Sequence, residues 1–500
     1  MITLTDITQI NWGTAVAVAY HDEKITIAPT LLDHVTRSRA HFQTLIDRGV
    51  PCYGVTTGLG KLVSINLTDE ERADLPHNIL RARAAAIGSP FPRPVARAIM
   101  FLRLLNFLSG SSGVTAELCT YIADRLNDGF TPWIPSVGHG MAADAIAHTH
   151  AFQTLIGEGF VLTDSGEKMA AREALAQRGV EPIRLGQKEG LSLLNGISAA
   201  PAFALHAHRQ LSQVLQLATA VAATSVEGCA CPKDSFQPEI KAVTREAGTK
   251  ILIDQLHGRL ANSQIKPHSL QTAISFRIIP QVHGALYDGL VTWRKNIEDE
   301  MQTFSDNPLM VIDDSAEGGR FLSVGSFHNQ HVVNQAEHLA VALAHVAALS
   351  SRRLHRLLNQ YNTALNPQLA PRPGLDAGLV VAQKATVGLM ARVQQLASPV
   401  SIFTAESSAG QEDYMSQAIP TIARLEEMVN LTKMILAYEL FAALTALDQR
   451  GIRPGDGVAP LQDFFVAHIP PLTRDRSPGP DVEKILALFE TASFLTLIDK

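Results

Sequence analysis

Residues 134–159, IPSVGHGMAADAIAHTHAFQTLIGEG, join a glycine-rich loop to a helix of small residues. The loop surrounds Gly138 and Gly140, and the helix is predicted to start near Asp144 and to run to Gly157. A loop-to-helix junction of this kind directs backbone N–H groups and the positive end of the helix dipole toward a ligand. The pattern therefore predicts a ligand site at this junction.

Three histidines, His139, His148 and His150, crowd the same segment. His148 and His150 are two residues apart on a helix, so their side chains diverge by about 200° and do not face one ligand. The C-x-C pair, Cys229 and Cys231, does not match a metal spacing either. We therefore expect no metal ion, and we interpret His139, in the loop itself, as a candidate acid/base group.

Long helical patterns dominate the middle of the chain. Apolar residues follow a three-four spacing in 332–358, and similar patterns predict helices over 376–397 and 419–448. Helices of this length in a soluble protein pack into bundles. Near the N-terminus, ITLTDI and KITIAP predict short strands, and 31–48 predicts a helix. The fold class is thus mainly α, with a mixed N-terminal region over 1–190 and a helical bundle with C-terminal helices over 191–500.

Composition narrows the possible partners and location. The chain has 500 residues, of which 46% are hydrophobic and only 18% charged, less than the usual quarter or so. Such a chain is expected to bury surface in subunit contacts as well as in its core. A net charge of −6 without a basic run argues against nucleic acid as a partner. No signal-peptide pattern is present, and the most apolar run, Leu339–Leu349, is too short to span a bilayer. We expect a cytoplasmic protein with reduced thiols and no membrane partner.

Further segments contain residues suited to chemistry. Each has a plain structural interpretation when it is taken alone: a turn, a helix entry, a surface arginine or a solvated helix start. The segments are YGVTTGLG from Tyr53, QKEGLSLLNGIS with Asn195, LQTAISFRIIPQVHG with Gln271, Ile274 and Arg277, SDNPL at 305–309, Ser326-Phe327-His328, and SAGQEDYMSQ with Glu412.

Together these segments resemble the active-site motifs of the histidine/phenylalanine/tyrosine ammonia-lyase family over nearly the whole chain. The resemblance implies a long central helical bundle and a homotetramer whose pockets are built by segments from several subunits. It also implies roles for individual residues. Tyr53 is the base for the β-proton, Asn195 holds the cofactor carbonyl or the substrate, and Arg277 takes the substrate carboxylate. Glu412 is the active-site carboxylate and Phe327 the pocket aromatic, while Gln271 matches the motif of Arg277.

The departures from the family pattern concentrate at its reaction centre. In the family an Ala-Ser-Gly tripeptide cyclises to the electrophile methylidene-imidazolone (MIO), but here the tripeptide position is Met141-Ala142-Ala143, in a loop one residue short. The serine and the glycine that the cyclisation uses are both absent, so we expect no MIO and no other cofactor. Ile274 takes the place of a family tyrosine, and Arg83 replaces a histidine with a permanent charge.

These observations lead to one expectation for function and one alternative. We expect an ammonia-lyase-like enzyme that performs MIO-independent acid/base chemistry (elimination, conjugate addition, isomerisation or cyclisation) on a carboxylated or unsaturated small molecule. The alternative is a catalytically inactive homologue that binds a ligand or assembles with a partner. The expected catalytic residues are Tyr53, Asn195, Glu412 and His139, and the expected substrate-binding residues are Arg83, Gln271, Ile274, Arg277, Phe327 and Met141.

Overall fold

The computed structural model describes residues 1–140, 142–313 and 318–498; Met141 lies outside them. The described chain is mainly helical, as predicted, and its strands pair two by two. It forms two compact units. The first comprises Met1–His206, Arg294–Asn334 and Val400–Ala423, and the second comprises Ala207–Trp293, Gln335–Pro399 and Arg424–Lys500.

The predicted boundary near residue 190 therefore differs from the observed division. Two segments distant in the sequence, 294–334 and 400–423, belong to the N-terminal unit. One physical reason is a buried ion pair, in which the Lys188 ammonium lies 3.1 Å from a carboxylate oxygen of Asp306. Such a contact joins distant segments of the chain, and neither composition nor periodicity reveals it.

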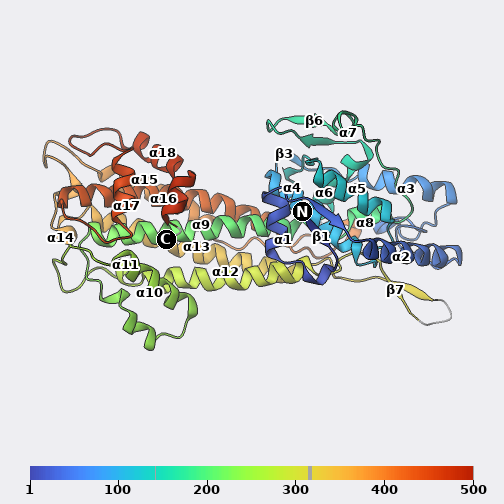
Figure 1. Ribbon diagram of the computed structural model, residues 1–500, viewed down its shortest axis with the longest axis horizontal. Helices are drawn as coiled ribbons and strands as arrows, with labels where there is room; N and C mark the ends of the chain where they lie inside the picture. Colours follow the sequence, from blue (N-terminus) through green and yellow to red (C-terminus); the bar gives the residue numbers. More distant parts are fainter. Residues whose placement is uncertain (141, 314–317, 499–500) are drawn as a thin grey trace. The chain divides into compact units, whose positions relative to one another are not determined.

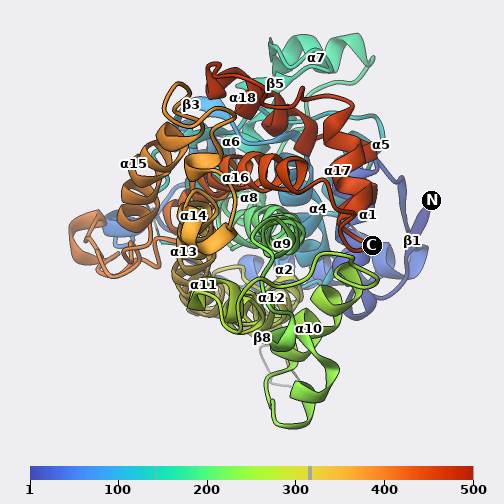
Figure 2. The same ribbon diagram turned by 90° about the vertical axis from the view of Figure 1, so that its left-hand side faces the viewer.

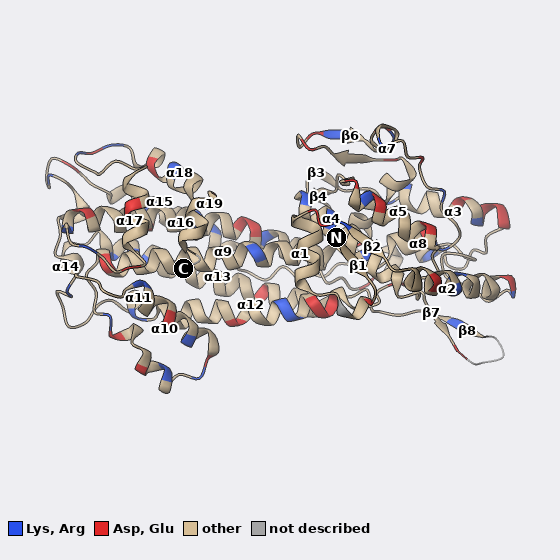
Figure 3. Cartoon of the chain, viewed as in Figure 1, with Lys and Arg blue, Asp and Glu red and all other residues tan. Residues whose placement is uncertain are grey.

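Short and medium helices make up most of the first unit. A capping box starts α3, because the Thr68 hydroxyl accepts from the Glu71 backbone N–H and the Glu71 carboxylate accepts from the Thr68 N–H. Acidic residues fill the first turn of this helix, where their negative charges interact favourably with the positive end of the helix dipole (Figure 3). The helices are α1 (Trp12–Tyr20), α2 (Pro29–Asp47), α3 (Asp69–Arg81), α4 (Arg93–Leu108), α5 (Ala116–Asn127), α6 (Ala145–Phe152), α7 (Ala171–Gln177) and α8 (Glu189–Leu194).

The strands of the first unit are short. The two predicted near the N-terminus are confirmed as β1 (Ile2–Leu4) and β2 (Ile25–Ile27), which pair in parallel. The other pairs are antiparallel, and β5, β6 and α7 lie together (Figures 1 and 2). These pairs are β3 (Ile87–Pro90) with β4 (Pro135–Val137), β5 (Phe160–Leu162) with β6 (Lys168–Ala170), and β7 (Leu309–Ile312) with β8 (Gly319–Leu322).

Four long helices have residues in both units: α9 (Ala199–Gly228), α12 (Ile279–Met301), α13 (Gln330–Leu357) and α16 (Ala418–Arg450). The last two confirm the helices predicted over 332–358 and 419–448. Within the second unit, α12, α13 and α16 surround α9 (Figures 1 and 2). Their core includes an ion pair in which Arg353 Nε lies 2.6 Å from the fully buried carboxylate of Glu439, which also accepts the Ser225 hydroxyl.

Shorter helices complete the second unit: α10 (Ala247–Arg259), α11 (Ile274–Arg277), α14 (Gln360–Thr363), α15 (Val380–Leu396), α17 (Ala459–Val466), α18 (Pro478–Phe489) and α19 (Ala492–Ile498). Among the described helices, α13 and α16 are long and apolar enough to cross a membrane by length and composition. The apolar run Leu339–Leu349, expected to be too short, is part of the longer helix α13. Half or more of the most apolar window of each is buried inside the protein, as in the core helices of soluble proteins.

Candidate active site

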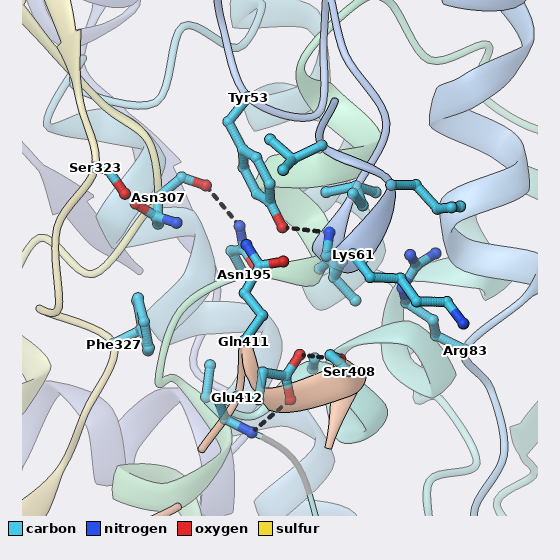
Figure 4. Close-up of a pocket in the computed structure, with 18 of the residues that line it drawn as sticks. Tyr53, Lys61, Arg83, Asn195, Asn307, Ser323, Phe327, Ser408, Gln411 and Glu412 are labelled. Atoms are coloured by element: carbon cyan, nitrogen blue, oxygen red, sulfur yellow. Dashed lines mark hydrogen bonds between the residues drawn. The ribbon is translucent and has the colours of Figure 1, made fainter. Parts of the chain in front are cut away.

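A pocket of about 770 Å³ opens within the first unit (Figure 4). It brings together five of the residues predicted from the sequence: Tyr53, Arg83, Asn195, Phe327 and Glu412. They come from segments up to several hundred positions apart in the chain. The remaining lining residues are Leu59, Gly60, Lys61, Leu62, Val63, Ala142, Ala143, Ala145, Leu194, Asn307, Ser323, Val324, Ser408, Ala409 and Gln411.

Tyr53 lies in the turn-rich loop that follows α2. Gly54 has a φ of +65°, and a Cβ at this position would lie 2.7 Å from the side chain of Leu59, so the turn requires glycine. Gly60 also has a positive φ, and its N–H donates to the phenol oxygen of Tyr53 over 2.8 Å. The loop therefore holds the phenol at the pocket with a backbone donor directed at its oxygen.

Asn195 follows the last residue of α8. Its side-chain amide donates to the backbone oxygen of Asn307 over 2.5 Å, which links α8 to the segment before β7 (Figure 4). The Asn307 side chain in turn accepts from the Val324 N–H over 2.9 Å. Three pocket residues are thus fixed relative to one another through two hydrogen bonds.

A buried charge cluster holds this segment in place. The Asp306 carboxylate accepts from Lys188 over 3.1 Å and from the Ser192 hydroxyl over 2.7 Å. Burial by itself would raise the pKa of Asp306, but Lys188 and Arg103 outweigh it and hold that pKa below its ordinary value. Asp306 therefore remains ionised inside the protein and binds the 305–307 segment to α8.

Glu412 lies just after a 3₁₀ turn, Ser408–Gly410, with its carboxylate at the pocket. One oxygen accepts from the Ser407 hydroxyl over 3.1 Å and from the Ala142 N–H over 3.4 Å, and the other accepts from the Ser408 hydroxyl over 3.1 Å. All three donors are neutral. They orient Glu412 and leave its negative charge to act on the pocket.

Arg83 comes two residues after the end of α3. It is half-buried, and its Nη1 donates to the backbone oxygen of Ile79 over 3.3 Å. Burial lowers the pKa of Arg83, whereas negative charge on Tyr53 and on Glu412 raises it. Arg83 therefore lies within electrostatic reach of both groups, on the same side of the pocket as Lys61 (Figure 4).

The predicted loop-to-helix junction is confirmed. Helix α6 begins at Ala145 and continues as a 3₁₀ turn to Gly157, which has a φ of +77°. Asp144, before the helix, accepts from the Ala200 N–H over 2.7 Å, and burial raises its pKa to about 7. Ala142, Ala143 and Ala145 line the pocket, whereas Met141, expected to bind substrate, lies outside the described residues.

His139 does not line this pocket. Its Nε2 lies 2.7 Å from the backbone oxygen of Pro135, and its ring stacks on Phe91 with centroids 5.2 Å apart. Burial lowers its pKa. This position does not support the acid/base role expected for His139. His150, by contrast, has a structural contact, since its Nε2 accepts from the Ala86 N–H over 3.0 Å.

Gln271, Ile274 and Arg277 lie in the second unit and are not among the residues that line the pocket. All three are exposed, with Ile274 at 63% of its full accessible area. The pocket of a single chain is therefore formed without the carboxylate-binding arginine that the resemblance implied.

Comparisons with known proteins identify the family. Residues 10–467 match the family described as aromatic amino acid lyase. The histidine ammonia-lyase of Anaeromyxobacter sp. (strain K) is 33% identical over 489 residues, which cover 95% of this chain and 96% of that protein. The chain belongs to the aromatic amino acid lyase family.

Solved structures of this family's fold extend along the whole chain. The tyrosine aminomutase of Streptomyces globisporus has a TM-score of 0.91 at 26% identity, covering 100% of this chain and 98% of that one. Ergothionase of Treponema denticola, named as an ergothioneine-degrading enzyme, has a TM-score of 0.94 with complete coverage of both chains. At 24% identity, the latter likeness shows the fold alone. The long helical bundle expected from the resemblance is thus confirmed.

In this member of the family, several lining residues were not singled out from the sequence: Lys61, Asn307, Ser323, Ser408 and Gln411. Four of them stand in or beside segments that were recognised, namely the Tyr53 loop, SDNPL and SAGQED. The signal was present, but a motif does not tell which of its side chains face the pocket.

Proposed function

We propose that this protein is a lyase that works without MIO and eliminates a quaternary ammonium group from an amino-acid betaine. The observation that supports it most is the composition of the pocket. A tyrosine placed as a base, an aromatic ring and an oriented carboxylate are retained, while the residues that build the family's electrophile are replaced.

The residues at 142–143 do not fit MIO. Ala142 and Ala143 have methyl side chains, so neither has the hydroxyl whose loss as water turns a serine Cβ into the methylidene carbon. The Ala142 N–H donates toward Glu412 instead. No step of the proposed reaction passes through that group.

Without an electrophile, the amine of the substrate must already be a leaving group. A free α-amine is not, because it needs activation before its C–N bond breaks. A quaternary ammonium has a permanent positive charge and no lone pair, so it departs directly as a neutral tertiary amine. Aromatic faces and carboxylates are the groups that recognise such cations, and Phe327, Tyr53 and Glu412 provide them here.

The step balances with this chain's own groups. Tyr53, as phenolate, takes the proton from Cβ. The electron pair of the broken C–H bond forms the Cα–Cβ double bond, and the C–N pair leaves with nitrogen as trimethylamine. The product is an α,β-unsaturated carboxylate. The Gly60 N–H, 2.8 Å from the phenol oxygen, stabilises negative charge there before the transfer.

The test compares trimethylammonium betaines of histidine, phenylalanine and tyrosine with the corresponding free amino acids. Ergothioneine, the compound that the Treponema enzyme is named as degrading, joins the panel. We expect trimethylamine and a conjugated acid from at least one betaine, and no appreciable ammonia from the free amino acids. Robust ammonia release from any free amino acid would refute the proposal. Binding without turnover across the panel would favour the inactive homologue.

The proposal extends to assembly and location: a cytoplasmic homotetramer with D2 symmetry. Gln271 and Arg277, exposed on the second unit, would then serve the pocket of another copy. Large apolar side chains stand exposed in the single chain, among them Leu270 at 93% and Phe403 at 71%, and these suit burial between subunits. Light scattering on the eluting protein should give four times the chain mass, and a monomer at micromolar concentration would remove the basis for a shared pocket.

A further inference from the structure

Two cations line one side of the pocket without a carboxylate partner. Within the described ranges, neither Lys61 nor Arg83 forms an ion pair, and the one hydrogen bond from the Arg83 guanidinium goes to the backbone oxygen of Ile79. Arg81, two residues earlier, shows the contrast, since its Nε lies 2.6 Å from Glu158. Among the described residues, no ion pair therefore neutralises this positive charge, and Tyr53 and Glu412 act on Arg83 only through space.

Glu412 does not fill this role. Its two oxygens are engaged by Ser407, Ser408 and the Ala142 N–H, and it influences Arg83 only through space. Removing a guanidinium from water without a counter-charge costs free energy. The lowered pKa of Arg83 reflects that cost. An anionic ligand would offset it, and a planar guanidinium suits a carboxylate in particular.

The opposite side of the pocket has a different character. Phe327, Asn307 and Ser323 lie there, away from Lys61 and Arg83 (Figure 4). These side chains are uncharged. A zwitterionic ligand in this pocket meets positive charge on one side and neutral, partly aromatic surface on the other. The orientation that places its anionic group near Lys61 and Arg83 is therefore lower in free energy than the reversed orientation.

We propose that Lys61 and Arg83 form an anion subsite that binds a carboxylate of the substrate and turns its ammonium toward Phe327. The inference rests on the proposed function for the zwitterionic nature of the substrate. The family has a histidine at the Arg83 position, so the subsite arises from this chain's own departure. The bound carboxylate comes either from the α-carbon or from the substrate's side chain.

The experiment measures binding by titration calorimetry, so it needs no turnover. The probes are trans-cinnamate, whose carboxylate is the α-carboxyl, and 4-carboxycinnamamide, whose charge lies only on the ring. We expect Arg83→Gln to weaken the better-bound probe about tenfold or more, as for loss of a charged hydrogen bond. Lys61→Gln should weaken it less, because Lys61 is exposed, and Arg83→Lys should recover part of the affinity. Which of the two probes binds identifies the source of the carboxylate.

Arg81→Gln is the matched control, because it removes the same charge nearby at a group already paired with Glu158. Phe327→Leu completes the design. It should weaken binding of tetramethylammonium more than it weakens binding of the anionic probe, whereas Arg83→Gln should do the reverse. Equal affinities in Arg83→Gln, Arg81→Gln and the unaltered protein would overturn the subsite, and so would failure of both probes to bind. An Arg83-dependent anion site in a protein that eliminates nothing would leave the subsite standing and refute the proposed function alone.

Discussion

The phenol oxygen of Tyr53 accepts a hydrogen bond from the backbone N–H of Gly60, 2.8 Å away in the same loop. A backbone donor fixed in this way costs no reorganisation when negative charge develops on the oxygen. Arg83 adds a positive charge within electrostatic range. Tyr53 is accordingly the side chain in the pocket best placed to act as the base.

Replacing Tyr53 with phenylalanine should lower kcat for betaine elimination by about 10² or more, the usual scale for a lost acid/base group. The ring and its packing stay, so binding of the unsaturated product should change little. Steady-state rates of trimethylamine release measure the effect. Tyr361→Phe, at a tyrosine 85% exposed in the second unit, serves as the control and should keep full activity. An unchanged kcat in Tyr53→Phe would show that Tyr53 contributes to packing and is not the base.

Much of the fold follows from periodicity. The helices predicted over 332–358, 376–397 and 419–448 appear as α13, α15 and α16 within a few residues, because a long three-four pattern has few other ways to bury its apolar face. The hairpins β5–β6 and β7–β8 were not predicted, since strands of three or four residues give too short a pattern. The periodicity of the sequence does not indicate the division into two units. That division depends on contacts between distant segments, such as the one between Lys188 and Asp306.

The site was predictable to the extent that motifs determine it. Tyr53, Asn195 and Glu412 converge as the motifs implied. The position of His139 could not be derived, because its ring stacks on Phe91, which belongs to no recognised motif. Arg277 is exposed in the single chain, and the resemblance had predicted a pocket to which several subunits contribute.

Asp306→Asn should destabilise the protein by about 3–5 kcal/mol, the cost of leaving a buried cation without its partner. The side chains of Lys188 and Asp306 are 0% and 2% exposed, so solvent cannot compensate for the lost charge. Thermal unfolding measures the change. Asp299→Asn provides the control, because its pair with Lys295 is largely exposed and should contribute no more than about 1 kcal/mol. Similar melting temperatures for the two variants would contradict the structural role of the cluster.

In acid, the buried His148 should lower the free energy of unfolding of the protein, because its ring is harder to protonate in the folded state than in the unfolded state. This ring is fully buried between the Leu194 backbone oxygen and the Ser198 hydroxyl, and burial lowers its pKa to about 3. The unfolded chain binds a proton near pH 6.5, so it holds more protons than the folded one between pH 6.5 and 3. Stability is therefore lost as the pH falls through this window.

His148→Gln removes the titration and keeps one donor and one acceptor at the site. Between pH 6.5 and pH 5, the free energy of unfolding of the unaltered protein should fall by about 2 kcal/mol more than that of this variant, at about 1.4 kcal/mol per pH unit. Melting temperatures at pH 7.5 and pH 5 check the trend. An exposed histidine, His268, gives the control His268→Gln, which should leave the pH dependence unchanged. Parallel pH curves for His148→Gln and the unaltered protein would show that the ring does not titrate as its burial requires.

Rebuilding the family tripeptide separates a decayed ammonia-lyase from a redesigned one. The change combines Met141→Ala, Ala142→Ser and Ala143→Gly with insertion of the missing loop residue. A mass lower by two waters would report that the ring has formed. Even then we expect little ammonia from histidine, phenylalanine or tyrosine, because Arg83 leaves a fixed charge at the pocket and Ile274 has no phenol. Groups that act as a unit in catalysis are not restored singly. Efficient deamination by this variant, with positions 83 and 274 unchanged, would mean that the pocket had kept the family's chemistry and would favour the inactive homologue for the natural chain.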